Sequence, residues 1–372
     1  MSIFIEQLIV SYDCIIKSKR QRSNMRLYKY DFVRAVAILF VVAVHSLYFV
    51  DQNNLACLWI YWTLQTLFFT GNALFFLLSG KFNLRERTDD AGVKKYYYSK
   101  IRNILLPIVI VFLTRTFYNL YPDITALGFT KAFIKNFSFE FASTEYWFVF
   151  SLMGCILVAP FLAHAFAKLS RFEQKVFLAI GLAYNLFVVI AGNAGYAFKW
   201  GYLFTGFSFM FCLGQYIETF FTPRNKHCLM VAAPICLVAT VILISYGMRT
   251  NVQDASPLFT ILSFGVYSLL LFLGDITKPS KVVSFIAKHS FSIYLVHMMV
   301  LLPLESILPI LPGPTSFLMH IGVTLLVFTA STAIAFVLDK GIINPAKAVF
   351  DKIFKRFLPK QNAEFGSTVS SS

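Results

Sequence analysis

The sequence predicts an all-α polytopic membrane protein with about ten transmembrane helices and both termini in the cytoplasm. Three observations predict this fold class. Of the 372 residues, 58% are hydrophobic and only 14% are charged, whereas soluble domains carry about 25% charged residues. Apolar runs recur at spanning length along the chain, and the basic residues gather between them. This pattern excludes a soluble enzyme, a disordered protein and a secreted disulfide scaffold.

Ten segments are long and apolar enough to cross a bilayer. A helix needs about 20 mainly apolar residues to span about 30 Å of hydrocarbon. The second segment is the least regular, because Gln65, Gly71 and Asn72 lie in its middle. The predicted spans are residues 32–50, 58–80, 103–121, 145–167, 175–192, 201–220, 229–247, 257–274, 286–309 and 316–338.

The positions of the basic residues predict how these helices are oriented across the membrane. With the N-terminus inside, 27 of the 33 Lys and Arg residues fall in cytoplasmic segments, as the positive-inside rule requires. The net charge of +15 therefore reports topology, and we expect no nucleic acid partner. Six scattered Cys residues favour neither a disulfide framework nor a metal site.

The chain divides into three parts. Residues 31–338 form the ten-helix membrane domain, and residues 339–372 form a basic cytoplasmic tail. Residues 1–30 are a cytoplasmic segment whose apolar start could lie as a helix in the membrane interface. Met25 offers an alternative start, and on that interpretation residues 1–24 are a start-site artefact.

The first predicted span carries two ionisable side chains, Arg34 and His45. Ionisable groups at membrane depth are costly and usually functional. The two are 11 residues apart, so they share one helix face about 16 Å apart along the axis. Asp31 precedes Arg34 by three residues and can pair with it. The alternative is that Arg34 only extends to the inner headgroups and His45 is a packing residue.

His45 suits two kinds of chemistry in a helical bundle. Histidine is the usual general base near neutral pH. It could activate a hydroxyl for attack on an acyl group, or relay a proton in a transporter. The physical chemistry of this span leaves both open.

Five short motifs resemble those of one family in order along the chain. Asp31-Phe-Val-Arg34 with the apolar run to His45-Ser46 resembles the opening motif of the membrane acyltransferases called acyltransferase family three. The resemblance covers residues 28–338, and its helix count and motif order agree. The other motifs are FFLLSGKF (75–82, with Lys81 as an additional residue), KIRNILLP (100–107), EYWFVFSL (145–152) and FSIYLVH (291–297).

The resemblance implies an integral-membrane O-acyltransferase, most often an O-acetyltransferase, of the bacterial inner membrane. Such enzymes transfer an acyl group from cytoplasmic acyl-CoA to hydroxyls of cell-surface polysaccharides or their lipid-linked precursors. It implies that His45 is the catalytic histidine and Arg34 its paired arginine. Acetyl-CoA is then a donor substrate, and neither a permanently bound cofactor nor a metal is expected.

A cytoplasmic, cationic dock is expected for the phosphates of coenzyme A. The loop 81–102 is the richest in basic residues, and its tyrosines would suit an adenine ring. The resemblance favours Arg102 most, since the family's basic run continues into a proline-containing helix in this way. The alternative is that these cations only orient the chain. The candidate donor-binding residues are Lys94, Lys95, Lys100 and Arg102.

Four further residues are candidates for binding the acceptor. Arg115 lies within the third predicted span, and Glu145 and Trp147 lie at the outer mouth of the fourth. His297 lies inside the ninth, where helix–helix hydrogen bonding is the alternative role. The competing function for the whole chain is a transporter or flippase that exports a glycan or an acylated substrate.

Overall fold

The computed structural model describes residues 28–87, 89–139, 146–196, 206–248 and 256–354, and within these ranges the chain is helical and contains no strand. Eight helices of the described part are long and apolar enough to cross a membrane. The chain is therefore an all-α, multi-pass membrane protein. The predicted interfacial helix at the N-terminus lies outside the described residues.

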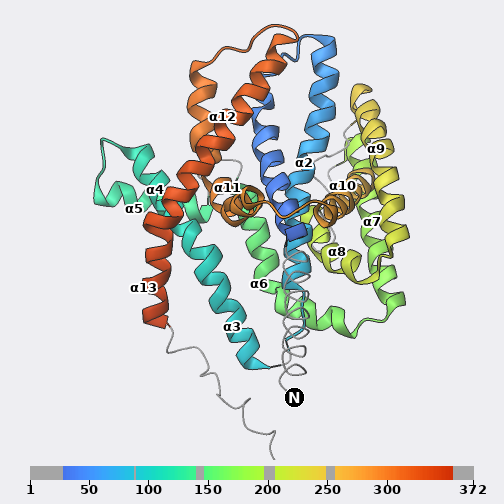
Figure 1. Ribbon diagram of the computed structural model, residues 1–372, viewed down its shortest axis with the longest axis horizontal. Coiled ribbons are helices and arrows are strands. Elements are labelled where there is room, and N and C mark those ends of the chain that lie inside the picture. Colours follow the sequence, from blue (N-terminus) through green and yellow to red (C-terminus); the bar gives the residue numbers. More distant parts are fainter. Residues whose placement is uncertain (1–27, 88, 140–145, 197–205, 249–255, 355–372) are drawn as a thin grey trace, which may run out of the picture.

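The helices follow one another with short connections (Figure 1). A first helix (28–46) is extended by the short turn η1 (Leu47–Phe49). The other α-helices are α2 (Leu55–Asn83), α3 (Asp90–Lys100), α4 (Leu106–Leu120), α5 (Ala126–Ile134), α6 (Trp147–Lys168), α7 (Arg171–Asn193), α8 (Gly206–Phe220), α9 (Pro223–Ser245), α10 (Pro257–Ile276), α11 (Lys281–Ile307), α12 (Thr315–Leu338) and α13 (Asn344–Phe354). Three π-helical segments are η2 (Ile101–Leu105), η3 (Lys135–Phe139) and η5 (Asp339–Ile343).

Each of the ten predicted spans falls on a described helix. Two of them, α2 and α8, are not among the eight helices that meet the length and hydropathy limits. In α2, Gln65 and Asn72 dilute the apolar run, as the sequence indicated. The described part of α8 has 15 residues, because residues 201–205 lie outside the described ranges.

Local capping chemistry sets several helix starts. Asn54 caps α2 by accepting a hydrogen bond from the third backbone N–H beyond it, and Thr222 and Ser256 cap α9 and α10 in the same way. Ser170 and Glu173 form a reciprocal capping box at the start of α7. These caps satisfy backbone donors that would otherwise lack partners at the helix N-termini.

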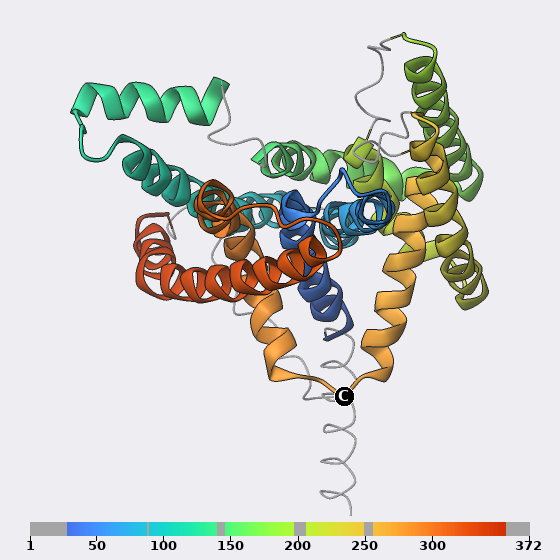
Figure 2. The same ribbon diagram turned by 90° about the horizontal axis from the view of Figure 1, so that it is seen from above.

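The first helix and α2 form the centre of the bundle (Figures 1 and 2). A Cβ added at Gly71 would lie 2.7 Å from the carbonyl oxygen of Ala37, so the two helices touch at the backbone. On its other side α2 packs on α8 just as closely, because a Cβ at Gly80 would lie 1.8 Å from the carbonyl oxygen of Phe211. The Ser-Gly step of α2 is therefore a site of close helix packing.

Two groups of helices flank this centre. Helices α7, α8, α9 and α10 lie on one side, and α4, α5, α12 and α13 lie on the other (Figures 1 and 2). Helix α11 runs beside α12 and also contacts α4. The core that joins these elements is rich in buried aromatic rings, including Phe76, Phe112, Tyr146, Phe209 and Tyr267.

Contacts between the loops agree with the predicted topology. Lys29 and Asp275 pair at 3.3 Å, and both belong to segments predicted to be cytoplasmic. At the other end, the Asp51 carboxylate accepts a hydrogen bond from the Gly313 N–H at 2.8 Å, and both loops are predicted to be external. The contacts group the loops by end, while the assignment of each end to a side of the membrane remains a prediction.

Part of the predicted C-terminal tail is helical. Residues 339–354 continue α12 through η5 into α13. The Asp339 carboxylate contacts the His289 imidazole and accepts a hydrogen bond from Ser292 Oγ at 2.6 Å, which fastens this continuation to α11. The tail beyond residue 354 lies outside the described residues.

Candidate active site

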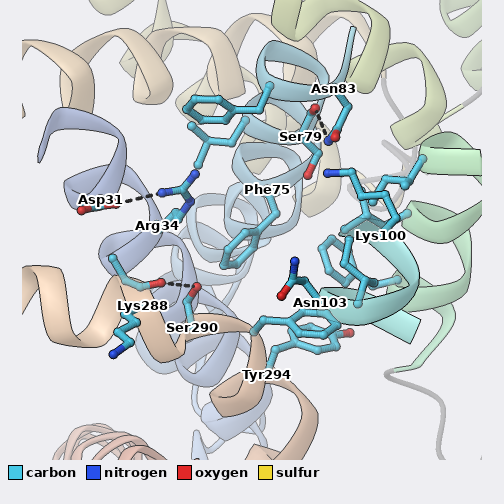
Figure 3. Close-up of a pocket in the computed structure, with 18 of the residues that line it drawn as sticks. Asp31, Arg34, Phe75, Ser79, Asn83, Lys100, Asn103, Lys288, Ser290 and Tyr294 are labelled. Carbon is cyan, nitrogen blue, oxygen red and sulfur yellow. Dashed lines mark hydrogen bonds and ion pairs between the residues drawn. The ribbon is translucent and has the colours of Figure 1, made fainter. Parts of the chain in front are cut away.

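A cavity of about 490 Å³ opens between the first helix, α2, the α3–η2 junction, α6 and α11. It brings together predicted site residues from several helices, and Figure 3 shows its lining. Aromatic rings form part of the wall, and polar or charged groups line it on several sides. These polar and charged lining residues are Asp31, Arg34, Ser79, Asn83, Lys100, Asn103, Ser284, Lys288 and Ser290.

Two cations face this cavity from opposite walls. The Arg34 guanidinium is bound by Asp31 at 2.8 Å and lies over the Phe82 ring at 5.1 Å. Lys100 enters from the end of α3, opposite Arg34, whereas the amino group of Lys288 points away (Figure 3). Arg34 is half-buried, and its single carboxylate partner leaves other guanidinium donors for a bound anion.

A network of ring contacts, hydrogen bonds and an ion pair connects to Arg34 through Phe82. Phe82 packs edge-on against Tyr30 at 5.1 Å between ring centres. Tyr30 and Tyr267 both donate hydrogen bonds to the buried Glu218 carboxylate, at 3.1 and 3.2 Å, and Lys81 lies 3.9 Å from the same group. Thus the first helix, α2, α8 and α10 meet at one buried carboxylate, and Phe82 connects this network to Arg34.

The π-helical segment η2 supplies the amide side chain of Asn103 to the cavity wall. Asn103 lies in η2 and lines the cavity. Its side-chain oxygen accepts a hydrogen bond from Arg102 Nη1 at 3.0 Å, and its amide nitrogen donates to Ser99 Oγ at 3.2 Å. π-Helical segments are uncommon and frequent at functional sites.

Tyr294 connects the cavity to a pair of histidines. Its ring lines the cavity and lies 5.4 Å from the ring of His297. His297 is fully buried, its Nδ1 lies 2.6 Å from the Tyr294 carbonyl oxygen, and among the described residues its Nε2 has no hydrogen-bond partner. The His45 and His297 rings lie 5.2 Å apart. The structure thus joins two residues that the sequence assigned separately to catalysis and to acceptor binding.

The end of the first helix is fixed next to His45. Ser46 Oγ lies 3.2 Å from His320 Nδ1 and 2.6 Å from Thr324 Oγ1. All three side chains are buried. Because Ser46 adjoins His45, these contacts with α12 hold the backbone that carries the histidine.

A buried arginine lies near the histidine pair. Arg115 of α4 is only 6% exposed, and its Nη1 donates to the Tyr146 hydroxyl at 3.3 Å. Tyr146 in turn donates to the Leu295 carbonyl at 2.8 Å. The positive charge of Arg115 lies within electrostatic range of the His297 imidazole. Tyr146 therefore joins α4, the start of α6 and α11 around the buried side of the histidine pair.

Other predicted site residues lie elsewhere. Arg102 points to α13, where Asp351 binds it. Lys94 and Lys95 are exposed on α3 and do not line the cavity. Trp147 packs on Phe207 at 5.2 Å, within the core. Glu145 lies outside the described residues.

The sequence does not single out several residues of this site, among them Asn103, Tyr146 and Tyr294. Each of these three stands inside a motif that carried the resemblance. Tyr294 precedes His297 by three residues, so the two share a helix face. That spacing alone could have identified Tyr294 as a residue close to the predicted site residue His297. The local sequence gives no such signal for Asn103 or Tyr146, because their partners come from distant helices.

A comparison with protein families matches residues 27–340 to a family described as an acyltransferase domain, the acyltransferase family 3. This range includes every helix that lines the cavity. Neither a search of curated proteins nor a search of solved structures finds a match to the chain.

Proposed function

Since the chain belongs to acyltransferase family 3 and is a multi-pass membrane acyltransferase, we propose that it transfers an acetyl group from acetyl-CoA to a hydroxyl of a glycan. The acceptor in this proposal is a cell-surface polysaccharide or its lipid-linked precursor, in the bacterial inner membrane. One observation carries the proposal: the cavity that Arg34 and Lys100 line is also lined by Tyr294, whose ring packs against the His45–His297 pair.

The charged end of the cavity suits the phosphates of coenzyme A. Arg34 and Lys100 offer donors from opposite walls, and charge-assisted hydrogen bonds to phosphate are among the strongest in proteins. Phe75, Phe148 and Tyr294 line the path inward and suit the pantetheine arm. Because the cytoplasm holds the donor, this end faces the cytoplasm, in agreement with the predicted orientation.

His45 is the general base in this proposal. It accepts the proton of the acceptor hydroxyl, whose oxygen then attacks the thioester carbonyl carbon. The C–S bond breaks, the acyl group stays on the acceptor oxygen, and the thiolate of coenzyme A leaves and takes up the proton from the imidazolium. His297 packs against His45 and fixes the orientation of its ring.

Arg34 and Arg115 have separate roles in this mechanism. Arg34 lies about 16 Å along the helix from His45, so it cannot contact the carbonyl at which His45 acts. Arg115 is buried beside the histidine pair and acts on His297. A buried cation stabilises the negative oxygen of a tetrahedral intermediate more strongly than an exposed one. We therefore assign the phosphates to Arg34 and the oxyanion to Arg115.

The test compares acetylation in cells that carry wild-type protein or single variants at matched membrane levels. The His45→Ala variant should abolish the acetyl content of the surface polysaccharide. His227→Ala is the matched control, since His227 is an exposed histidine far from the cavity, and it should acetylate as wild type does. Undiminished acetylation in the His45 variant would refute the base assignment.

A further inference from the structure

Helix α13 packs on the segment that forms one wall of the cavity. It contacts η2, and Phe350 lies 5.4 Å from Tyr98 between ring centres. The family match ends at residue 340, before α13 begins. Whatever α13 contributes to the cavity therefore comes from beyond the matched residues.

One carboxylate of α13 binds Arg102 with both oxygens. Arg102 Nε lies 2.6 Å from Asp351 Oδ1, and Nη2 lies 2.8 Å from Oδ2. The Tyr98 hydroxyl donates to Oδ1 at 2.6 Å. This is the two-pronged arrangement in which arginine binds a carboxylate most strongly and with the most defined geometry.

The third nitrogen of the same guanidinium reaches the cavity wall. Arg102 Nη1 donates to Asn103 Oδ1, and Asn103 lines the cavity. All three guanidinium nitrogens are therefore used, two on Asp351 and one on Asn103. An unbroken chain of hydrogen bonds runs from α13 through Arg102 to the amide that faces Arg34 and Lys100.

We propose that Asp351 is a positioning residue for donor binding, which acts by holding Arg102 so that Arg102 orients Asn103 on the cavity wall. The inference rests on the proposed acetyl-CoA donor. It replaces the expected role of Arg102, because Asp351 occupies Nε and Nη2, the edge of the guanidinium that would bind a phosphate with two hydrogen bonds, and Nη1 is bonded to Asn103. The pair is about one-third exposed, so its effect is on geometry more than on stability.

The test uses the full-length protein and four variants. Asp351→Asn keeps the shape and removes the charge, Arg102→Ala removes the pair, and Arg102→Lys keeps the positive charge without the forked geometry. Lys352→Gln is the control, an exposed neighbour on the same helix. Two quantities are measured, the Kd for acetyl-CoA and the amide hydrogen exchange of residues 101–105.

We expect Asp351→Asn and Arg102→Ala to raise the Kd about five- to tenfold, a range typical of coupled hydrogen-bonded residues. Exchange across residues 101–105 should rise in the same two variants. Arg102→Lys should raise both quantities nearly as much as Arg102→Ala does, and Lys352→Gln should leave both unchanged. A failure of lysine to replace arginine separates positioning from phosphate contact, since a lysine at position 102 would still attract a phosphate.

Three results would overturn the inference. The first is exchange that stays as in wild type when Asp351 is neutralised, which needs no bound donor to observe. The second is an Arg102→Lys variant that binds acetyl-CoA as tightly as wild type does. The third is tighter binding by Asp351→Asn, which would mean that Asp351 competes with the donor. A wild-type protein that binds no acetyl-CoA would refute the proposed donor itself, and with it the role of Asp351 toward that donor.

Discussion

Arg34 and Arg102 belong to two regions that the sequence treats alike and the structure separates. Both precede or begin an apolar helix at the end predicted to be cytoplasmic, and the sequence predicts a function for both, Arg34 in catalysis with His45 and Arg102 in donor binding. Arg34 has one contact with a carboxylate three residues away and faces a cavity. Arg102 is bound by both oxygens of a carboxylate on another helix.

The difference lies in where each carboxylate comes from. Asp31 stands on the same helix as Arg34, so it balances the charge while the guanidinium still reaches into the cavity (Figure 3). Asp351 comes from the far end of the chain and accepts hydrogen bonds from Nε and Nη2 of Arg102, the two donors that would bind a phosphate together. A cation therefore has to be judged by how many of its donors the protein already uses, as well as by its position.

A third arginine gives the largest expected effect. Arg115→Gln removes the buried charge beside the histidine pair, and we expect kcat to fall about a hundredfold, as for the loss of an oxyanion donor. The KM for acetyl-CoA should change less than about twofold, because Arg115 does not line the cation end of the cavity. Steady-state kinetics check this prediction. A higher KM at unchanged kcat would show instead that Arg115 binds substrate in its ground state.

The next largest effect contrasts Arg34 with Arg102 directly. Arg34→Ala should raise the KM for acetyl-CoA about tenfold or more, because a charge-assisted contact with phosphate is lost. Arg34→Lys should recover part of this loss, since the charge stays and the forked geometry does not. The contrast between the two arginines would fail if Arg102→Lys recovered donor binding to the same extent as Arg34→Lys.

The packing of the helix between the two regions gives a moderate effect. Gly80→Ala would force a Cβ into the backbone of α8, and overpacking of this kind costs about 1–3 kcal/mol. Gly322→Ala is the control, because nothing lies within 4 Å of a Cβ there. Thermal unfolding should show a lower midpoint for the Gly80 variant alone. Equal midpoints would mean that α2 and α8 can move apart.

The smallest effect lies at the other end of the bundle, at Asp51. Hydrogen bonds from the backbone N–H groups of Gly313 and Asn53 lower the pKa of this carboxyl below its usual value. Its stabilising contribution is therefore present above the unfolded-state pKa of about 3.9 and is lost as the pH falls through the folded-state pKa. Asp51→Asn should unfold at a slightly lower temperature near neutral pH and converge with wild type below about pH 4. A constant gap across this range would contradict the prediction.

Hydropathy and charge patterns in the sequence predict much of the fold. They located the helices because a spanning helix must be apolar over a known length, and the ten predicted segments all fall on described helices. Helical periodicity also placed Arg34 and His45 on one face. The pairing of Arg102 with Asp351 could not be predicted in this way, because the residues are 249 positions apart and no local pattern encodes which distant helices meet.

The same limit explains the site. His45 and His297 were both selected as ionisable groups at membrane depth, but only the fold brings their rings to 5.2 Å. Tyr146 was overlooked between two residues that were selected, although its hydroxyl joins Arg115 to α11. Aromatic residues are so frequent in this chain that composition does not distinguish a site tyrosine from a packing one.

The most direct test of the account measures donor binding and acetyl transfer together in the His45→Ala variant. The account separates a cation end that binds acetyl-CoA from a histidine end that performs the transfer. It predicts a Kd for acetyl-CoA within about twofold of wild type, since His45 does not line the cation end, and acetyl transfer to the surface glycan reduced at least a hundredfold, a typical loss for a general base. Transfer that persists at the wild-type rate would contradict the central claim.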